Sequence, residues 1–359
     1  MTAPRLRASG AMPSITVDGD AYRQGFQHGR AFAGLIRANV AEMYAERKRI
    51  TTLGRTWDYD GLVERNFAFA MDQRPELADE IDGLSAGSGI DRTDLVHLNV
   101  PLYLVATLLP LECTVLLSTH ESASTLGKTR DLPNAMTNVL LHRWHPDGAE
   151  SVELMHAGAV TMPAAGLNSA GLMWASTGVW AKSTTIDIEE LADHWLIVDL
   201  AGMTRDCVDT AALAEELEAA RSVTNLIVTA VDAQQQARRI EYCPGRTEIL
   251  PAVSRAAVAT NHFSAPALVS EAPTREEYPS TYTRAELGMA SLAGQEDHGA
   301  EGIWALLADH GAGDGLGICR HHAVSAQGNR TQCGTVSTWP EGVLEGWLGH
   351  PCERNPVRS

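Results

Sequence analysis

Cys113 and Thr114 open a run of apolar and β-branched residues, CTVLLST, near the first third of the chain. A free cysteine is most often a small buried hydrophobe, and that interpretation stays open for Cys113. The alternative is a nucleophile that becomes reactive once the chain is cut in front of it. Such a cut places an α-amine, with a pKa of about 8, on the same residue as the thiol, so the amine can take the thiol proton. One residue then supplies both nucleophile and base.

A second candidate nucleophile is Ser85, at the centre of GLSAG, which matches the GxSxG pattern. In an α/β-hydrolase the serine of that pattern follows a strand and precedes a helix. Here RPELADEIDG before it predicts an acidic helix, and SGIDRTDL after it predicts a loop. Ser85 is therefore interpreted as a small residue in a glycine-rich loop that ends a helix, and a serine hydrolase is kept only as an alternative.

Thirteen histidines and six cysteines raise the question of a metal site. No HExxH motif occurs, and His142 and His145, three residues apart at the end of a predicted strand, would not point to one side. The six cysteines stand far apart, without the close pairs of a structural zinc site or a disulfide framework. The sequence therefore predicts no metal, no cofactor, and free thiols in a reducing compartment.

The composition is that of an acidic globular protein. The 359 residues are 44% hydrophobic, and 28 Lys and Arg against 45 Asp and Glu give a formal charge of −17. That charge disfavours nucleic acid or an anionic membrane as a partner. The start, MTAPRLRASGAMPS, has no apolar core of signal-peptide length, and no apolar run is long enough to span a bilayer. We expect a cytoplasmic protein.

The predicted secondary structure changes character near Cys113. Apolar residues recur at helical spacing in AYRQGFQHGRAFAGLIRANVAEMYAERKR and YDGLVERNFAFAMDQRPELADEIDGL, so the first third is predicted to be mainly α. Strands are then predicted in CTVLLST, MTNVLLHRWH, SVELMHAG and GLMWAST, separated by turns at ASTLGKTRDLPN, HPDGAE and GLNSAG. Val115 and Leu117 alternate with Leu116, an apolar pattern on both faces that suits a sheet covered on both sides.

Helices and strands continue toward the C-terminus. Helices are predicted in IEELADHWLIVDLAGMTR and DTAALAEELEAAR, strands in NLIVTAVDA, RRIEYC and AAVATNHF, and helices again in STYTRAELGMASLA and EGIWALLADHG. Runs of strands between runs of helices favour an α+β layered architecture over a strictly alternating βα pattern. No internal repeat or low-complexity linker divides the chain.

The order and approximate spacing of several motifs resemble those of a known family. The chain is similar to the acyl-coenzyme A:6-aminopenicillanic acid acyltransferase family, also called isopenicillin N acyltransferase-like, within the N-terminal nucleophile hydrolases. The resemblance covers most of the chain, and no single motif is specific by itself. The motifs are GFQHGRA, the CT at 113 and 114, GKTRD, GLNSAGL, ATNHF, STYTR, GICRH and LGHPC.

The resemblance implies a four-layer αββα sandwich of the N-terminal nucleophile hydrolase type, preceded by an N-terminal helical segment. It also implies a precursor that cuts itself between Glu112 and Cys113 into two chains that stay associated. The first would be the helical segment of residues 1–112, and the second a catalytic αββα domain of residues 113–359. A homo-oligomer is left open.

Carried over residue by residue, the resemblance assigns four catalytic positions. Cys113 matches the nucleophile, and Asp131, the acid of GKTRD, matches the carboxylate that holds the new α-ammonium group. Asn261 matches a side-chain amide that stabilises the oxyanion, and Arg320 matches a basic residue of the active site. For Asp131, Asn261 and Arg320, a polar residue that only supports the fold is the alternative.

Three more residues are candidates for substrate binding. Thr114 can donate a hydrogen bond during self-cleavage, and His262 can touch the substrate, although both can instead pack and cap. Trp174, with Trp180 nearby in GLMWASTGVW, can form an apolar acyl pocket if a turn brings it to the site. Packing in the core is the alternative for both tryptophans.

Two positions depart from the family pattern. Glu112 stands where the family often has glycine, and a side chain there affects the strained peptide that self-cleavage requires. GKTRD also has Thr129 where an asparagine is usual. These departures keep a non-catalytic binding protein of the same fold as an alternative.

The predicted function is hydrolysis of a small N-acyl amide through a thioester at Cys113. The same thioester passed to an amine would make an acyltransferase, and the residues do not separate these outcomes. Because the chain contains no glycine-rich phosphate loop and no Lys/Arg cluster that would cradle coenzyme A, hydrolysis is favoured.

Overall fold

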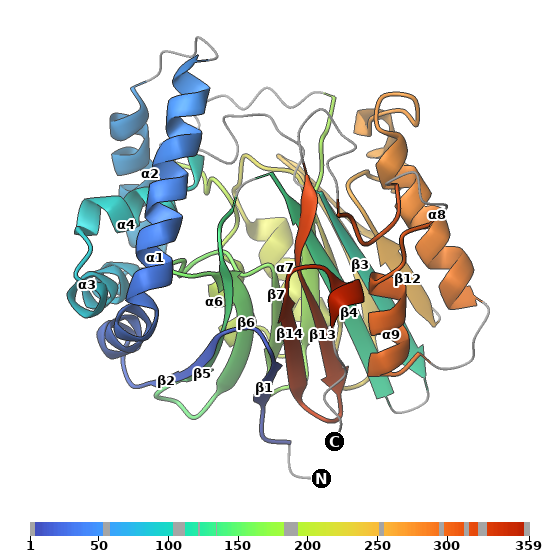
Figure 1. Cartoon of the computed structure of the whole chain (residues 1–359), viewed down its shortest axis with the longest axis horizontal. Coiled ribbons are helices and arrows are strands. Elements are labelled where there is room, and N and C mark those ends of the chain that lie inside the picture. Colours follow the sequence, from blue (N-terminus) through green and yellow to red (C-terminus); the bar gives the residue numbers. More distant parts are fainter. Residues whose placement is uncertain are drawn as a thin grey trace.

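Two β-sheets lie face to face in the computed structural model of the chain, and helices cover both outer faces (Figure 1). The structure describes residues 4–52, 58–102, 112–120, 123–133, 135–182, 193–250, 255–293, 298–311, 316–321 and 329–354. The predicted four-layer αββα sandwich is therefore confirmed. In this order of layers each sheet packs against the other sheet on one face and against helices on the other face, so both faces of both sheets are buried.

The smaller sheet has six strands among the described residues. Its central strands are antiparallel, and β1 at one edge pairs parallel with β14. In spatial order the strands are β1 (Arg7–Gly10), β14 (Val343–Leu348), β13 (Arg330–Trp339), β4 (Ala123–Leu132), β3 (Glu112–His120) and β12 (Ala256–Ala259).

The larger sheet has eight described strands, antiparallel except at the β2 edge, where β2 pairs parallel with β5. In spatial order they are β11 (Arg246–Leu250), β10 (Ala237–Cys243), β9 (Leu226–Val231), β8 (Met173–Gly178), β7 (Ala165–Asn168), β6 (Glu150–His156), β5 (Asn138–Trp144) and β2 (Ser14–Asp18).

Each sheet has its own layer of helices. The smaller sheet is covered by α8 (Pro279–Ala293) and α9 (Ala300–Leu307), with the short 3₁₀ helices η2 (Val269–Glu271) and η3 (Pro351–Glu353) in the C-terminal half. The larger sheet is covered by α6 (Leu200–Asp206) and α7 (Thr210–Ala219) and by the group α1 (Ala21–Thr52), α2 (Tyr59–Gln73), α3 (Glu76–Ser88) and α4 (Arg92–Asn99).

Strand alternation divides the apolar residues among these layers. In β3, Val115 and Leu117 join the core between the two sheets, where Leu154 of β6 also lies. Leu116 points the other way and packs with Ile303 of α9. Successive residues of a strand point to opposite faces, so a fully apolar strand serves two cores.

The described part of the first 112 residues contributes β1 to the smaller sheet, β2 to the larger sheet and the helices α1 to α4. Arg7 of β1 aligns with Val343 of β14, and Ser14 of β2 aligns with Leu140 of β5. These two strands lie in a stretch for which the sequence predicted no element. Backbone hydrogen bonds therefore join the N-terminal segment to both halves of the sandwich.

Glycines set the close approach of α1 and α3. Gly25 and Gly29 of α1 face Gly83 and Gly87 of α3, and a Cβ on any of them would lie 1.9–2.4 Å from a carbonyl oxygen of the other helix. Only glycine permits such backbone contact. GLSAG is therefore a helix-packing motif, and Ser85 lies inside α3 rather than at a strand-to-helix elbow.

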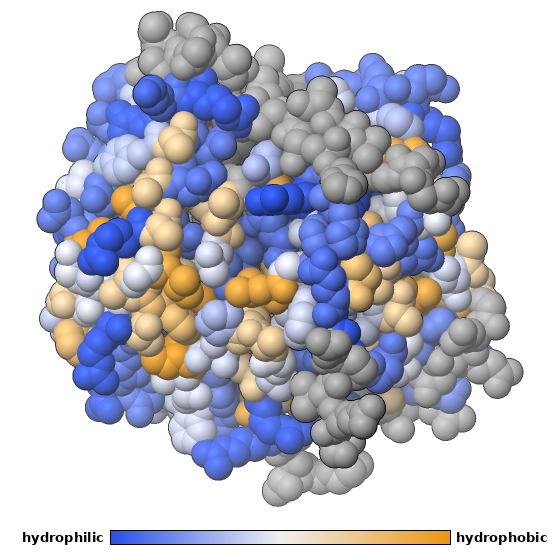
Figure 2. All heavy atoms as spheres, in the orientation of Figure 1, coloured by the Kyte–Doolittle hydropathy of each residue, from blue (hydrophilic) through white to orange (hydrophobic). Residues whose placement is uncertain are grey.

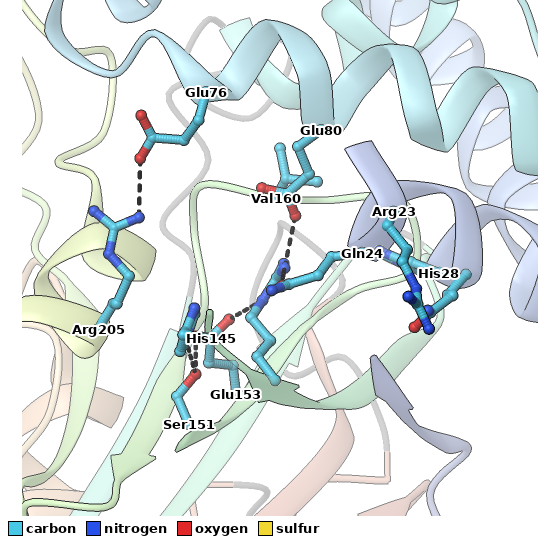
Figure 3. A network of polar contacts seen from close by, with 12 residues as sticks. Arg23, Gln24, His28, Glu76, Glu80, His145, Ser151, Glu153, Val160 and Arg205 are labelled. Atoms are coloured by element: carbon cyan, nitrogen blue, oxygen red, sulfur yellow. Dashed lines mark hydrogen bonds and ion pairs between the residues drawn. The ribbon is translucent and has the colours of Figure 1, made fainter. Parts of the chain in front are cut away.

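Buried ion pairs also tie α3 to the larger sheet (Figure 3). Glu80 lies 2.7 Å from Arg143 of β5 and 3.1 Å from Arg74, and Arg143 lies 3.1 Å from Glu153 of β6. Arg74 reaches 2.7 Å to Asp199, just before α6. The network crosses from the first 112 residues to the rest of the chain.

Some predicted elements were wrong. ASTLGKTRDLPN is not a turn, because residues 123–132 form β4 in the middle of the smaller sheet. SGIDRTDL is a loop only in part, because α4 begins at Arg92 inside it, whereas GLNSAG starts within β7 and makes its predicted turn at Ser169 and Ala170. In IEELADHWLIVDLAGMTR the described helix is Leu200–Asp206, residues 193–199 are not helical, and residues 188–192 lie outside the described residues.

The visible face in Figure 2 alternates hydrophilic side chains with smaller hydrophobic patches, as expected for an acidic chain with a buried core. In the described ranges, none of the helices combines the length and the apolar character that crossing a bilayer demands.

Candidate active site

Cys113 is the second residue of β3 and is buried between β4 and β12. It shares the strand face of Val115 and Leu117, so its thiol is directed toward the space between the sheets. Lys128 of β4, opposite Val115 in the ladder, is on the same face, and the thiol of Cys113 is near enough to raise the pKa of its ammonium. The Lys128 Nζ also donates to the carbonyl oxygen of Ser176 in the opposite sheet. The thiol therefore lies between the sheets beside a buried amine.

Lys128 was not among the sequence-predicted site residues. Burial lowers the pKa of its ammonium, while the neighbouring Cys113 raises it. Arg130, directly opposite Cys113 in the ladder, donates to Asn138 Oδ1 and lies 3.0 Å from His156 Nε2. Both cations belong to the segment that the sequence predicted as a turn. Lys128 and Arg130 are two residues apart, and this strand-like spacing was the signal in the sequence that could have placed both cations on one face of a strand.

The backbone of Cys113 is held on both sides by side chains of distant elements. Its N–H donates to Asn261 Oδ1 at 3.1 Å, and its carbonyl oxygen accepts from Arg284 Nη1. Asn261 Nδ2 donates to the carbonyl oxygen of Gly178 at 2.8 Å. The structure thus brings Asn261 to Cys113, with its amide oxygen rather than its nitrogen on the Cys113 backbone.

Arg284 of α8 organises this arrangement. Its guanidinium is fully buried. The Nη1 atom donates to Thr114 Oγ1, and the Nη2 atom donates to Asn261 Oδ1, each over a distance of 2.8 Å. One planar donor group therefore fixes the side chains next to Cys113. The motif STYTR contains Arg284, but nothing in its local spacing indicated where its side chain would reach.

Asp131 lies opposite Glu112 in the ladder, one position from Cys113. Burial raises the pKa of this carboxyl to about 6, although the Arg284 charge and a hydrogen bond from Thr331 oppose the shift. Its Oδ1 accepts from Thr331 Oγ1 at 2.8 Å, whereas Oδ2 is buried and has no hydrogen-bond partner in the part of the chain that is described. A buried carboxylate oxygen of this kind calls for a donor.

Glu112 and Arg320 form an ion pair in which both side chains are buried. Ser280 Oγ donates to the other Glu112 oxygen at 2.9 Å. The backbone N–H of Arg320 donates to Thr331 Oγ1 at 2.9 Å, so Thr331 connects Arg320 with Asp131. Four segments far apart in sequence therefore meet around the Glu112–Cys113 peptide.

The three substrate-binding candidates lie in different surroundings. Thr114 accepts from Arg284 and positions that guanidinium. The ring of His262 stacks on Tyr282 at 4.0 Å, and burial lowers its pKa to about 4. Trp174 is fully buried on the outer face of the larger sheet, where its Nε1 donates to Thr204 Oγ1 at 2.9 Å. The structure does not bring Trp174 to Cys113, because its strand position turns it away from the inter-sheet space.

Comparisons with known proteins give only distant similarity. No protein-family model and no curated protein matches the chain. Among solved structures, the conjugated bile acid hydrolase of Clostridium perfringens aligns with TM-score 0.44 and 12% identity over 66% of this chain and 89% of that one. Penicillin V acylase of Agrobacterium tumefaciens aligns with TM-score 0.36 and 14% identity over 62% of this chain and 79% of that one. At these values neither protein carries a residue role or a substrate over to this chain.

Proposed function

We propose that the protein is a self-processing amidohydrolase of the N-terminal nucleophile type, which cleaves a small N-acyl amide through a thioester at Cys113. One observation carries the proposal. Cys113 is held at its backbone nitrogen by Asn261 and at its backbone oxygen by Arg284, and its thiol lies on the strand face that also carries the buried amine of Lys128. A cysteine that only filled space would need neither of the two hydrogen bonds nor the neighbouring amine.

Self-cleavage begins in the uncut chain, where no α-amine is present to act as a base. Lys128 takes the thiol proton, and the thiolate attacks the carbonyl carbon of Glu112. Lys128 returns the proton to the nitrogen of Cys113 as the C–N bond breaks, so that this nitrogen becomes an amine and the Glu112 acyl group is carried on sulfur as a thioester. Water then hydrolyses the thioester to the Glu112 carboxylate and the free thiol.

Asp131 has its role after the cut. The new α-ammonium group needs an acceptor, and Asp131 Oδ2 supplies one within a buried site. In each later turnover the α-amine, in its neutral form, takes the thiol proton and becomes the ammonium that Asp131 stabilises, and the thiolate attacks the substrate carbonyl. Hydrogen-bond donors directed at the oxyanion, with Asn261 as the proposed side chain, lower the barrier by about 3 kcal/mol.

The substrate site is inferred from Glu112. In the uncut chain its carboxylate fills the place formed by Arg320 and Ser280. Release of the Glu112 end frees this cation and this hydroxyl for an anionic group of the substrate. Water as acceptor makes the enzyme a hydrolase, and an amine as acceptor makes it an acyltransferase.

A second candidate function is that of an uncut, non-catalytic binding protein. The buried ion pair between Glu112 and Arg320 favours it, because separating a buried pair leaves an uncompensated charge. In that case Cys113 is a core thiol whose neighbours only support the fold.

Intact mass of the purified protein under denaturing conditions, followed by N-terminal sequencing, tests the proposal. We expect two fragments, one of them beginning Cys-Thr-Val-Leu, and a single chain for Cys113→Ala. A fully active, uncut Cys113→Ala protein would refute the proposal. One uncut wild-type chain whose Cys113 does not react with iodoacetamide would favour the binding protein, and fluorophosphonate labelling of Ser85 would favour the serine hydrolase.

A further inference from the structure

Four potential metal ligands gather around the segment that carries Arg320. They are His310, just after α9, Cys319 and His321 on either side of Arg320, and Cys352 in η3. Each offers one ligand atom, and these atoms all lie within 4.8 Å of one another. The group is separate from the residues around Cys113, and the proposed function gives it no role.

The spacing of the ligand atoms fits a tetrahedral site. With Zn–S of about 2.3 Å and Zn–N of about 2.0 Å, two thiolates lie about 3.8 Å apart, and a thiolate and an imidazole nitrogen about 3.6 Å apart. The Cys319 and Cys352 sulfurs are 3.7 Å apart. The His321 Nε2 atom lies 4.0 Å from the Cys319 sulfur and 2.9 Å from the Cys352 sulfur. The sulfur–sulfur distance already fits a tetrahedral site, whereas the 4.0 Å distance must shorten by about 0.4 Å and the 2.9 Å distance must lengthen by about 0.7 Å, which a rotation of the exposed Cys352 side chain can supply.

The surroundings of His321 match those of a ligating histidine. Its Nε2 faces the two sulfurs, and its Nδ1 lies 3.8 Å from Glu353 Oε1. Ligating histidines usually donate their other ring N–H to a carboxylate or carbonyl, which fixes the tautomer. The imidazole of His350 stacks on His321 at 3.9 Å and further limits its rotation.

The backbone around the cluster is also fixed. The N–H of Cys319 donates to the carbonyl oxygen of Asp309 at 2.8 Å. A Cβ on Gly317 would lie 2.2 Å from the carbonyl carbon of His310, so these two segments touch backbone to backbone. His310 is thereby held next to Cys319 by contacts that do not depend on their side chains.

We propose that His310, Cys319, His321 and Cys352 bind one Zn²⁺ ion that holds Arg320 in place. Two thiolates and two neutral imidazoles balance the charge of the ion, which suits a half-buried position. The ion joins the segment that carries Arg320 to the C-terminal η3. It is a structural ion, because four protein ligands complete its tetrahedron.

Two other states of the cluster compete with this one. A Cys319–Cys352 disulfide would require the sulfurs to approach to about 2.05 Å. A hydrogen-bonded cluster without an ion would keep both thiols free to react. Metal analysis and thiol mapping separate these states from a zinc site.

The test is zinc content of the untagged, full-length protein, purified from zinc-supplemented medium and dialysed before elemental analysis. We expect about one zinc per chain in the wild type, in Cys243→Ala and in Cys113→Ala, because these two cysteines lie outside the cluster. The double variant His310→Ala/Cys352→Ala should lose at least about nine tenths of the zinc. Both replaced residues are exposed, so the variant should fold.

A second measurement does not depend on any variant. Wild-type protein stripped of zinc and reloaded with Co²⁺ should show thiolate-to-cobalt charge-transfer absorption and the strong visible bands of a tetrahedral ion. Wild-type protein without zinc, full zinc content in the double variant, or a Cys319–Cys352 disulfide found by peptide mass would each overturn the proposal. None of these readouts depends on self-cleavage or amidase activity, so the zinc site and the proposed function fail separately.

Discussion

Glu112 and Arg320 form a buried ion pair at the peptide that precedes Cys113. Arg320 belongs to a segment more than 200 residues away, which the Thr331 backbone and hydroxyl hold on both sides. The pair fixes the residue on the acyl side of the proposed cut. Any group that replaces Glu112 in this place must satisfy the same buried guanidinium.

This relationship predicts that Glu112 slows processing. Glu112→Gly removes the interaction that holds the uncut conformation, so we expect the precursor to disappear several-fold faster after synthesis than in the wild type. Glu112→Asp keeps the charge and is the control, with a rate near the wild-type one. The measurement is a pulse-chase on a denaturing gel. A slower cut in Glu112→Gly would show that the ion pair aligns the scissile peptide.

Lys128 is predicted to be the base for the first cut. Lys128→Met removes the buried amine on the strand face that carries the Cys113 thiol, and Lys128→Arg keeps a charge but cannot accept the proton at neutral pH. We expect both variants to stay uncut at least 100-fold longer, with native circular dichroism. Processing of Lys128→Arg at the wild-type rate would mean that Lys128 contributes only its positive charge and does not act as the base.

Asp131 should affect the uncut and cut proteins in opposite directions. Since burial raises its folded pKa to about 6, the uncut fold binds more protons than the unfolded chain between the two pKa values, and its stability falls as pH rises through that window. Asp131→Asn in the uncut Cys113→Ala chain should therefore gain up to about 3 kcal/mol at pH 7.5.

In the otherwise wild-type protein, Asp131→Asn should lose activity at least 100-fold, because the α-ammonium has no carboxylate. Urea unfolding at pH 4 and pH 7.5 compares the stability of Cys113→Ala with that of Cys113→Ala/Asp131→Asn. Turnover compares the activity of the wild-type protein with that of Asp131→Asn. Equal stability at both pH values together with full activity would remove Asp131 from both roles.

The apolar strands and amphipathic helices could be predicted from the sequence, because their periodicity reflects the layers that they bury. β4 could not, because Lys128, Arg130 and Asp131 break its apolar pattern and resemble a turn. These buried charges are tolerated only because distant elements pair them. The charged residues that hide this strand in the sequence are the same residues that surround Cys113 in the fold.

The candidate site shows the same limit. Asp131, Asn261 and Arg320 came from a resemblance, and the fold gathers them around the Glu112–Cys113 peptide. Arg284 was missed because its partners lie about 170 residues away in sequence. Trp174 was placed near the substrate although its strand turns it to the outer core.

Glycine should be required where α1 crosses α3. A Cβ on Gly83 would lie 1.9 Å from a carbonyl oxygen of α1, whereas a Cβ on Gly34, also in α1, meets nothing within 4 Å. Gly83→Ala must move a helix and should cost more than about 2 kcal/mol, while Gly34→Ala should gain up to about 1 kcal/mol from helix propensity. Denaturant midpoints of the two variants test this. Tolerance of Gly83→Ala would mean that the helices are farther apart.

Glu80 and Glu76 offer a matched test of what holds the two predicted fragments together. Both are acids of α3, one turn apart, and both reach across the cut (Figure 3). Glu80 contacts the buried guanidinium of Arg143 across the cut and that of Arg74 in its own fragment, whereas the partly exposed Glu76 lies 2.9 Å from Arg205. Glu80→Ala leaves buried charge uncompensated and should cost about 3–5 kcal/mol. Glu76→Ala should cost less than about 1 kcal/mol.

The readout for this pair is urea unfolding together with native size-exclusion chromatography of the processed protein. Wild type and Glu76→Ala should elute as one complex that separates only on a denaturing gel, since two strand pairings also join the fragments. Glu80→Ala should release the residue 1–112 fragment at a lower urea concentration. Equal release in the two variants would mean that strand pairing and apolar packing hold the fragments without help from the buried ion pairs.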